Sequence, residues 1–211
     1  MKKAIWFIIM VVVVSTTSLA QEKRYGFENA VLKKRLGTGG VASAVVYIDD
    51  YGRKELTESN MSIPNQENVK LTMVTLIKDG YKYFTQKTSN DANTAQQRGT
   101  KFNMAKVDDY TMINYLNLTD EVKQKYQIEE KGNEQLLGKD CKRYELIATS
   151  PTPSGRSIKF SVYVWQGLVL KLSLVMGEIT SVQEEVTEIQ ENVTITKEKF
   201  DLPENVIFIE R

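Results

Sequence analysis

The chain has 211 residues, of which 41% are hydrophobic and 26% charged, with 12 glycines, one cysteine and no histidine. These proportions exclude collagen-like, disordered and disulfide-stapled proteins, and the length suffices for one ordinary domain or two small ones. The 28 basic and 27 acidic residues nearly balance, so the sequence lacks the basic footprint of a nucleic-acid-binding protein. Because histidine is the commonest general base and metal ligand, its absence removes the most frequent catalytic and metal sites.

Residues 1–20 have the features of a secretory signal. Two lysines form the positive start, residues 4–14 are an unbroken apolar run, and small residues follow up to Ala20. A membrane-spanning helix needs about 20 apolar residues, so this run is too short for a stable anchor. We therefore predict cleavage near Ala20 and a periplasmic or secreted mature chain of residues 21–211. Its first residue, Gln21, offers no thiol for lipidation.

The mature sequence has the pattern of antiparallel β structure. Apolar and β-branched runs alternate with turn residues, which is typical of strands joined by short connections. Asp79-Gly80 is the strongest hairpin signal, because both residues tolerate the positive φ of a type I′ turn. A change of apolar phase between Val186 and Ile189 predicts a β-bulge. The fold class is therefore mainly β (α+β), with strands expected near residues 27–36, 41–50, 69–78, 81–87, 135–148, 157–165, 168–176 and 179–195.

Burial decides the register that we predict for the hairpin of residues 157–176. A three-residue loop ending at Gly167 pairs Val164 with Leu168 and gathers the apolar side chains of both strands on one face. A two-residue loop would instead pair Trp165 with Leu168 and split the apolar side chains between the two faces. Because a half-buried sheet favours a one-sided apolar hairpin, we predict the three-residue loop.

Helix is predicted in only two short segments. Residues 107–117 carry apolar side chains at helical spacing, and Thr119 is a suitable N-cap for a second piece over residues 120–126. Each piece has a single apolar stripe, so both are expected to lie on the apolar face of the sheet. The polar residues 86–106 before them predict a long loop of the kind that is disordered or forms a functional flap.

The sequence shows no constellation of catalytic or metal-binding residues. Asp49-Asp50 comes closest to a carboxylate pair, but neighbouring strand residues point to opposite faces and the following Gly52 indicates a turn. Cys141 has no histidine partner, so it is expected to be a buried, inert thiol. Trp165 is expected to plug a sheet edge, with ligand stacking as the alternative. We expect no catalytic site, no metal and no cofactor.

Two charged runs are interpreted as solvated strand faces. The basic run Lys33-Lys34-Arg35 is balanced by nearby acidic residues, and the acidic run Glu184-Glu185 interleaves with apolar residues of a strand. Neither run therefore predicts a binding site.

Several short segments resemble those of exported envelope proteins. Tyr47–Glu55 and Gly138–Tyr144 resemble parts of small secreted envelope proteins, and Val164–Lys171 and Phe200–Pro203 are similar to patterns in periplasmic outer-membrane lipoprotein carriers, the LolA/LolB-like group. The resemblance is spread over residues 25–210. It implies an open antiparallel half-barrel whose concave, apolar face is covered by short helices and shelters acyl chains or another hydrophobic ligand. That group tethers its lid by an arginine, for which no equivalent is assigned here.

The leading interpretation is a non-enzymatic carrier, a single half-barrel domain over residues 21–211 that binds a hydrophobic small molecule, a lipid or a lipoprotein acyl chain. Burying an acyl chain gains about 0.8 kcal/mol per methylene, so the site needs only an apolar groove with a movable cover. The alternatives are an envelope module that fills its groove with its own helices and binds another protein, and a hydrolase with an unrecognised site. The groove is expected to be formed by Met112, Ile113, Leu116, Phe160, Val162, Leu170 and Leu172.

Overall fold

The computed structural model describes residues 22–37, 42–63, 66–88, 97–106, 110–149 and 157–211. The predicted signal segment lies outside these residues. Within them, no helix is long and apolar enough to cross a membrane. The strands are β1 (Ala30–Leu36), β2 (Ala42–Asp49), β3 (Lys54–Ile63), β4 (Gln66–Lys78), β5 (Tyr81–Thr88), β6 (Gln97–Asn103), β7 (Glu129–Leu136), β8 (Lys139–Thr149), β9 (Ser157–Trp165), β10 (Leu168–Met176), β11 (Ile179–Glu191) and β12 (Val206–Glu210).

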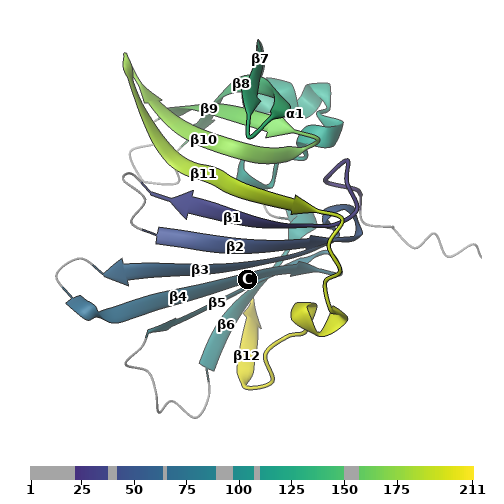
Figure 1. The fold of residues 1–211 in the computed structure, drawn as a ribbon, viewed down its shortest axis with the longest axis vertical. Helices are drawn as coiled ribbons and strands as arrows, with labels where there is room; N and C mark the ends of the chain where they lie inside the picture. Colours follow the sequence, from purple (N-terminus) through teal and green to yellow (C-terminus); the bar gives the residue numbers. More distant parts are fainter. Residues whose placement is uncertain (1–21, 38–41, 64–65, 89–96, 107–109, 150–156) are drawn as a thin grey trace, which may run out of the picture.

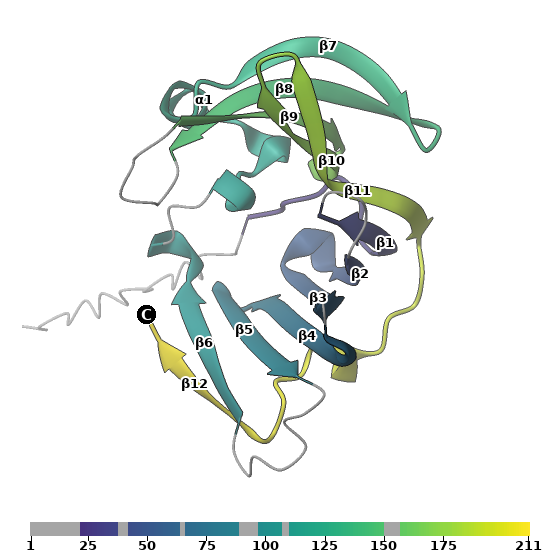
Figure 2. The same cartoon turned by 90° about the vertical axis from the view of Figure 1, so that its left-hand side faces the viewer.

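These strands form one 12-stranded sheet in the order β12-β6-β5-β4-β3-β2-β1-β11-β10-β9-β8-β7 (Figure 1). Neighbours pair antiparallel, except that β12 runs parallel to β6. Figure 2 shows that the sheet curls into an open, curved layer, with the helical turns between β6 and β7 on its inner side. The prediction of a mainly β protein with an open, mostly antiparallel sheet and short helices is confirmed.

Two turn and bulge predictions are confirmed by the backbone. Asp79 and Gly80 have φ angles of 53° and 77°, as a type I′ turn between β4 and β5 requires. The register between β1 and β11 shifts between Lys33 and Lys34, which face Glu188 and Val186, so the bulge lies where the apolar phase changes.

The register predicted for the β9–β10 hairpin is wrong. The structure pairs Trp165 with Leu168 across a two-residue turn, in which Gln166 and Gly167 have φ angles of 46° and 85°. A second β-bulge, between Val169 and Lys171, then shifts the register. Beyond it, Leu172 faces Val162 and Leu174 faces Phe160, so the apolar side chains share a face after all. The apolar side chains of β9 and β10 lie on one buried face, as expected. A β-bulge in β10, and not a longer loop, places them there.

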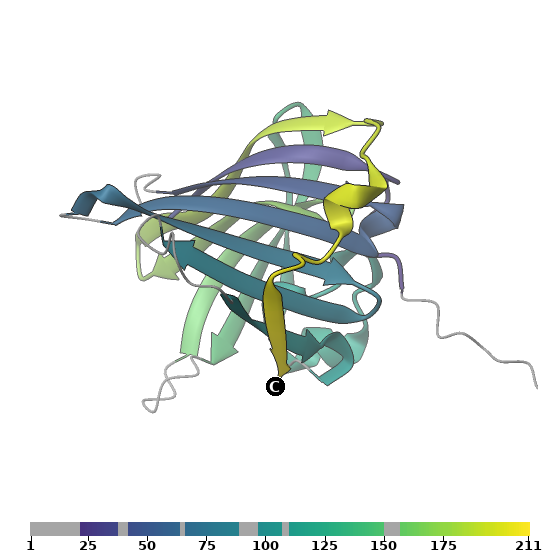
Figure 3. The ribbon, with the colours of Figure 1, turned by 90° about the horizontal axis from the view of Figure 1, so that it is seen from below.

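Four strands, β3, β6, β7 and β12, were not predicted from the sequence. Most of β3, β6 and β7 is polar, and the exposed pattern along β7 shows that it buries almost nothing. The predicted polar loop of residues 86–106 therefore contains β6, and the run predicted near 135–148 is divided by a turn at Leu137-Gly138. The short strand β12 comes after the segment of residues 192–205, which crosses the other strands in Figure 3.

The segment predicted as one helix over residues 107–117 consists of two 3-10 turns. These are η3 (Tyr110–Met112) and η4 (Tyr115–Asn117), while residues 107–109 lie outside the described part of the chain. Asn114 interrupts the segment in an extended conformation and caps η4, its side chain accepting a hydrogen bond from the Leu116 amide. The second prediction is confirmed, since α1 (Asp120–Lys125) begins after Thr119, whose side chain accepts from the Val122 amide. The remaining short helices are η1 (Asp50–Gly52), η2 (Met104–Lys106) and η5 (Lys197–Phe200).

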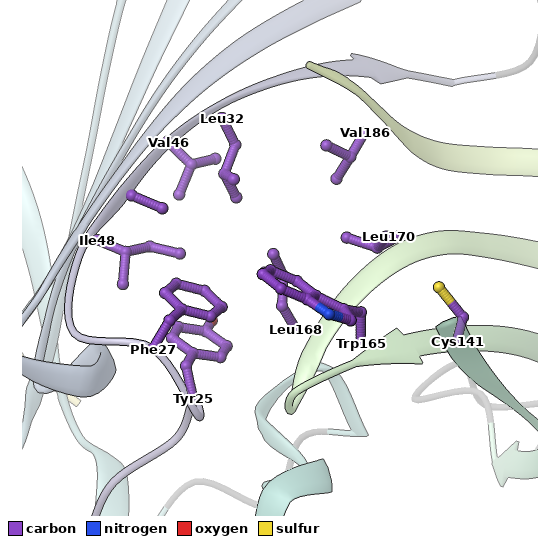
Figure 4. Close-up of a cluster of buried hydrophobic side chains, with 11 residues drawn as sticks. Tyr25, Phe27, Leu32, Val46, Ile48, Cys141, Trp165, Leu168, Leu170 and Val186 are labelled. Carbon is purple, nitrogen blue, oxygen red and sulfur yellow. The ribbon is translucent and has the colours of Figure 1, made fainter. Parts of the chain in front are cut away.

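An aromatic stack lies inside the curve of the sheet, between its central strands β1 and β2 and strands β8 to β10 near one end. Tyr25 stacks on Phe27 with ring centroids 5.4 Å apart, and Phe27 stacks on Trp165 at 5.2 Å. Figure 4 shows this stack between the side chains of β1 and β2 and those of β8 and β10. Trp165 belongs to β9, which lies between β8 and β10, so its side chain fills the interior of the curved sheet. The predicted position at a sheet edge is wrong. Elsewhere, Phe200 of η5 is fully buried against Leu56 and Leu76.

Gly52 ends the predicted turn and lies against the aromatic stack. Its φ is +82°, and a Cβ atom there would lie 2.5 Å from the ring of Tyr25. We expect Gly52→Ala to lower the free energy of unfolding by about 3 kcal/mol, because a left-handed conformation costs an L-residue about 1–2 kcal/mol and the ring contact adds overpacking strain. Urea denaturation measures this change.

Gly80 provides the matched control for that substitution. Its φ is +77°, but among the described residues nothing lies within 4 Å of the position that a methyl group would take there. Gly80→Ala should therefore cost only the conformational part, about 1–2 kcal/mol. Equal losses for the two variants would contradict the tight packing of Gly52 on Tyr25.

Candidate functional site

The site is built around a lid, which we define as residues 110–118. Its side chains Tyr110, Ile113, Tyr115 and Leu118 pack on the apolar cluster of β8, β9 and β10. Tyr110 stacks on Phe160 with centroids 4.9 Å apart, and Tyr115 lies against Tyr144 at 5.8 Å. The lid therefore covers the apolar face, as the sequence predicted for its helical segments.

An inner cavity of about 110 Å³ lies beneath the lid. Apolar side chains of β8, β9 and β10 form one wall, and lid residues form another. The wall contributed by the N-terminal segment and by β1, β3 and β11 is polar, so the cavity has one apolar and one charged end. Its lining comprises Arg24, Tyr25, Lys34, Glu55, Tyr110, Thr111, Ile113, Tyr115, Leu146, Val162, Gly167, Leu168, Val169, Leu172 and Glu184.

An outer groove of about 740 Å³ adjoins the inner cavity. Tyr115 and Gly167 line both spaces, so the lid residue Tyr115 stands at their boundary. Apolar, aromatic and charged side chains all line this groove. Its lining comprises Tyr115, Leu116, Leu118, Lys123, Ile128, Glu130, Asp140, Lys142, Tyr144, Val164, Trp165, Gln166 and Gly167.

The charged end of the inner cavity depends on Glu55. Its Oε2 accepts a hydrogen bond from the Tyr25 hydroxyl at 2.6 Å and one from Arg24 Nη1 at 3.0 Å. Burial alone would raise the pKa of Glu55, but the charge of Arg24 and the bond from Tyr25 outweigh it, so this pKa lies below its usual range. Burial raises the pKa of Tyr25, which keeps its hydroxyl protonated as the donor. A second ion pair, Lys34 to Glu184 at 3.4 Å, completes the charged wall.

The segment before β1 holds the lid in place. The side-chain amide of Asn114 donates a hydrogen bond to the Lys23 carbonyl at 3.0 Å, and that of Asn117 donates to the Glu22 carboxylate. The same segment is fixed to the sheet, because the Gly26 amide donates to the Gln166 carbonyl at 2.9 Å. We call residues 22–29 the strap, since they tie the lid to the turn between β9 and β10.

The structure brings only some of the predicted groove residues together. Ile113, Val162 and Leu172 line the inner cavity, and Leu116 lines the outer groove. Phe160 lies in the same cluster, beneath Tyr110. Leu170 is buried in the cluster around the aromatic stack, and Met112 is half-buried; neither lines a cavity among the described residues.

The charged wall was missed by the sequence analysis. Lys34 was interpreted as part of a solvated run, but its side chain is only 17% exposed, against 60% and 63% for its neighbours Lys33 and Arg35. Glu184, its ion-pair partner, lines the cavity although its side chain is 39% exposed. Alternation along β1 was the available signal, because Lys34 shares a face with the buried Leu32. No sequence pattern pointed to Arg24 and Glu55, which are 31 residues apart.

Outside these cavities, two other predictions can be compared with the structure. Cys141 is 1% exposed, and burial raises the pKa of its thiol, as expected for an inert side chain. Asp49 and Asp50 pair separately with Lys54 and Arg53 in the predicted turn, at 3.5 and 2.8 Å. Within the described residues, no cluster of three acidic or thiol ligands could hold a metal ion.

Comparison with known proteins gives likenesses of shape only. No protein-family model and no curated protein matches the sequence. An uncharacterised conserved protein from Thermus thermophilus is 10% identical with a TM-score of 0.48, and the match covers 87% of this chain and 91% of that one. MucB, in its complex with MucA from Pseudomonas aeruginosa, is 10% identical with a TM-score of 0.38, over 83% of this chain and 56% of that one.

A third match concerns the group to which the sequence shows a resemblance. A domain classed with outer-membrane lipoprotein-sorting proteins, from Vibrio parahaemolyticus, is 11% identical with a TM-score of 0.24, over 84% of this chain and 92% of that one. Because all three TM-scores lie below 0.5, these likenesses assign neither a family nor a ligand to this chain.

The buried carboxylate of Glu55 makes stability depend on pH. Its pKa is lower in the folded than in the unfolded chain, so its contribution is fully present above the unfolded value of about 4.3 and is lost as the pH falls through the folded value. We expect Glu55→Gln to lower the free energy of unfolding at pH 7, and the difference from the wild-type chain to shrink at pH 3. Urea denaturation at both pH values tests this; an equal loss at both would contradict it.

The lid should loosen when its bond to the strap is removed. Asn114→Asp keeps the oxygen that caps η4 but removes the amide that donates to Lys23. We expect amide hydrogen exchange to become about fivefold faster across residues 110–118, since a net hydrogen bond contributes about 1 kcal/mol. Global stability should change little. Unchanged exchange in the lid would show that the strap does not hold it.

Proposed function

We propose that this protein is an exported, non-enzymatic binding protein that holds a hydrophobic ligand, a lipid or a lipoprotein acyl chain, between its lid and the apolar face of β8, β9 and β10. One observation carries the proposal. The lid covers this face but leaves an inner cavity and an outer groove that meet at Tyr115 and Gly167. Burial of a chain on such a surface provides binding free energy without any reacting group.

The sizes of the two spaces define where a chain would lie. Pockets that hold drug-sized ligands enclose about 300–1,000 Å³. The inner cavity, at about 110 Å³, is too small for an acyl chain, whereas the outer groove, at about 740 Å³, is within that range. A chain would therefore occupy the outer groove over Val164 and Ile128, with one end passing Tyr115.

The charges around the inner cavity support binding and not acid–base catalysis. A general acid needs a pKa raised towards neutrality, whereas the pKa of Glu55 is held below its usual range. Oε2 of Glu55 accepts hydrogen bonds from both Arg24 and Tyr25, so the carboxylate acts as a fixed structural anion.

A second candidate function is favoured by the lid's own packing. Tyr110 already stacks on Phe160, and the space left under the lid is small. These contacts support a module that fills its groove with its own side chains and binds another envelope protein. The two functions differ in whether lipid accompanies the protein.

A groove-filling variant tests the proposed function. Val164 lines the outer groove, so Val164→Phe should lower the affinity for the fluorescent fatty acid cis-parinaric acid about tenfold by occupying the chain's space. Ile158→Phe is the matched control, because Ile158 lies in the same strand and cluster but lines neither space among the described residues. Circular dichroism confirms that both variants fold.

Native mass spectrometry of gently purified protein provides the second readout. Copurifying lipid would support the carrier. Protein that is free of lipid and fails to bind the probe would contradict it and favour the self-filled module.

A further inference from the structure

From the charged wall of the inner cavity we infer the class of head group: the ligand is an amphiphile with an uncharged, hydroxyl-bearing head, which binds at Arg24 and Glu55 while its chain extends into the outer groove. This inference rests on the proposed function and adds the chemistry of the ligand's polar end. Three features of the cavity lead to it.

The first feature is charge balance. Two cations, Arg24 and Lys34, and two carboxylates, Glu55 and Glu184, line the inner cavity, and each cation is paired with a carboxylate. A buried charge is costly unless it has a partner of opposite sign. An ionised head group would enter a space whose charges are already neutralised, so an anionic or cationic head is disfavoured and a neutral one is favoured.

The second feature is the hydrogen-bonding capacity at Glu55. Both hydrogen bonds to its carboxylate go to Oε2, and Oε1 has no hydrogen-bond partner among the described residues. Arg24 carries five N–H donors, of which Nη1 donates to this carboxylate. An acceptor and several donors therefore lie side by side. A hydroxyl matches this pair, because it donates one hydrogen bond and accepts others.

The third feature is the size and position of the cavity. A space of about 110 Å³ suits a small polar head and not a chain. The outer groove begins at Tyr115 and Gly167, which also line the inner cavity, so a head at Glu55 leaves its chain directed towards the larger space and its apolar residues Val164 and Ile128. Passage of the chain requires Tyr115 to move, and this side chain belongs to the lid.

The test compares three ligands that share one oleoyl or oleyl chain and differ in the head. Monoolein carries hydroxyls, oleate a carboxylate and oleylamine an ammonium group. Displacement of cis-parinaric acid at pH 7.5 measures their affinities. We expect monoolein to bind about tenfold more tightly than either ionised ligand, because the paired cavity charges leave a charged head without a partner.

Substitutions that change the charge of the wall should shift the ligand preference in opposite directions. A purely structural role of these residues would not produce such shifts. Glu55→Gln leaves an excess positive charge at the wall, so oleate should gain affinity relative to monoolein. Lys34→Met leaves an excess negative charge, so oleylamine should gain instead. Glu58→Gln is the control, since Glu58 pairs with Lys199 and does not line the cavity among the described residues.

The outcomes separate this inference from the proposed function. Equal affinities for the three ligands, or ratios that do not respond to Glu55→Gln and Lys34→Met, would overturn the head-group assignment while leaving the binding function intact. Failure of the wild-type chain to bind any of the three, or cis-parinaric acid, would overturn the proposed function itself.

Discussion

The buried interaction of Arg24 and Tyr25 with Glu55 is the constraint on which the rest of the site depends. It joins the strap to β3, and both hydrogen bonds meet at one carboxylate oxygen. Because breaking one partner of such a group leaves an uncompensated buried charge, the position of the strap is strongly fixed. The next residues of the strap then place Phe27 on Trp165, and this stack packs the central strands β1 and β2 against β8 to β10 across the inside of the curve.

The lid depends on the same strap. Two asparagine side chains, Asn114 and Asn117, bond to Lys23 and Glu22, and these hydrogen bonds add to the packing of the lid's apolar side chains on β8, β9 and β10. Two 3-10 turns have little stability of their own, and this makes the lid the element best suited to move. A rigid curved sheet with a tethered, movable cover is what reversible binding of a hydrophobic chain requires.

In the proposed function, the charged and apolar halves of the site have different physical roles. Apolar side chains of β8, β9 and β10 provide non-directional binding free energy in proportion to buried area. The wall around Glu55 provides direction, because hydrogen bonds have a geometry and unpaired charges are costly. Under the inference drawn above, a site that combines the two would select for an amphiphile and fix which of its ends enters first.

Several features could be predicted from the amino-acid sequence because they arise from local chemistry. The turn at Asp79-Gly80, the bulge before Ile189 and the cap at Thr119 follow from backbone preferences and from periodicity, which act over a few residues. The buried state of Cys141 was expected because a free thiol packs as a small hydrophobic side chain. The apolar face that lines the inner cavity was also readable, since Val162 and Leu172 lie in an alternating apolar pattern.

The remaining features could not be predicted, because they depend on contacts between segments that are distant in the sequence. Polar strands such as β6 are stabilised by pairing with neighbours, which leaves little trace in their own composition. The β9–β10 turn could take two residues because a later bulge restored the apolar face. The charged wall exists because strand pairing and the strap bring Arg24, Glu55 and Glu184 to one cavity, and no local pattern encodes that meeting.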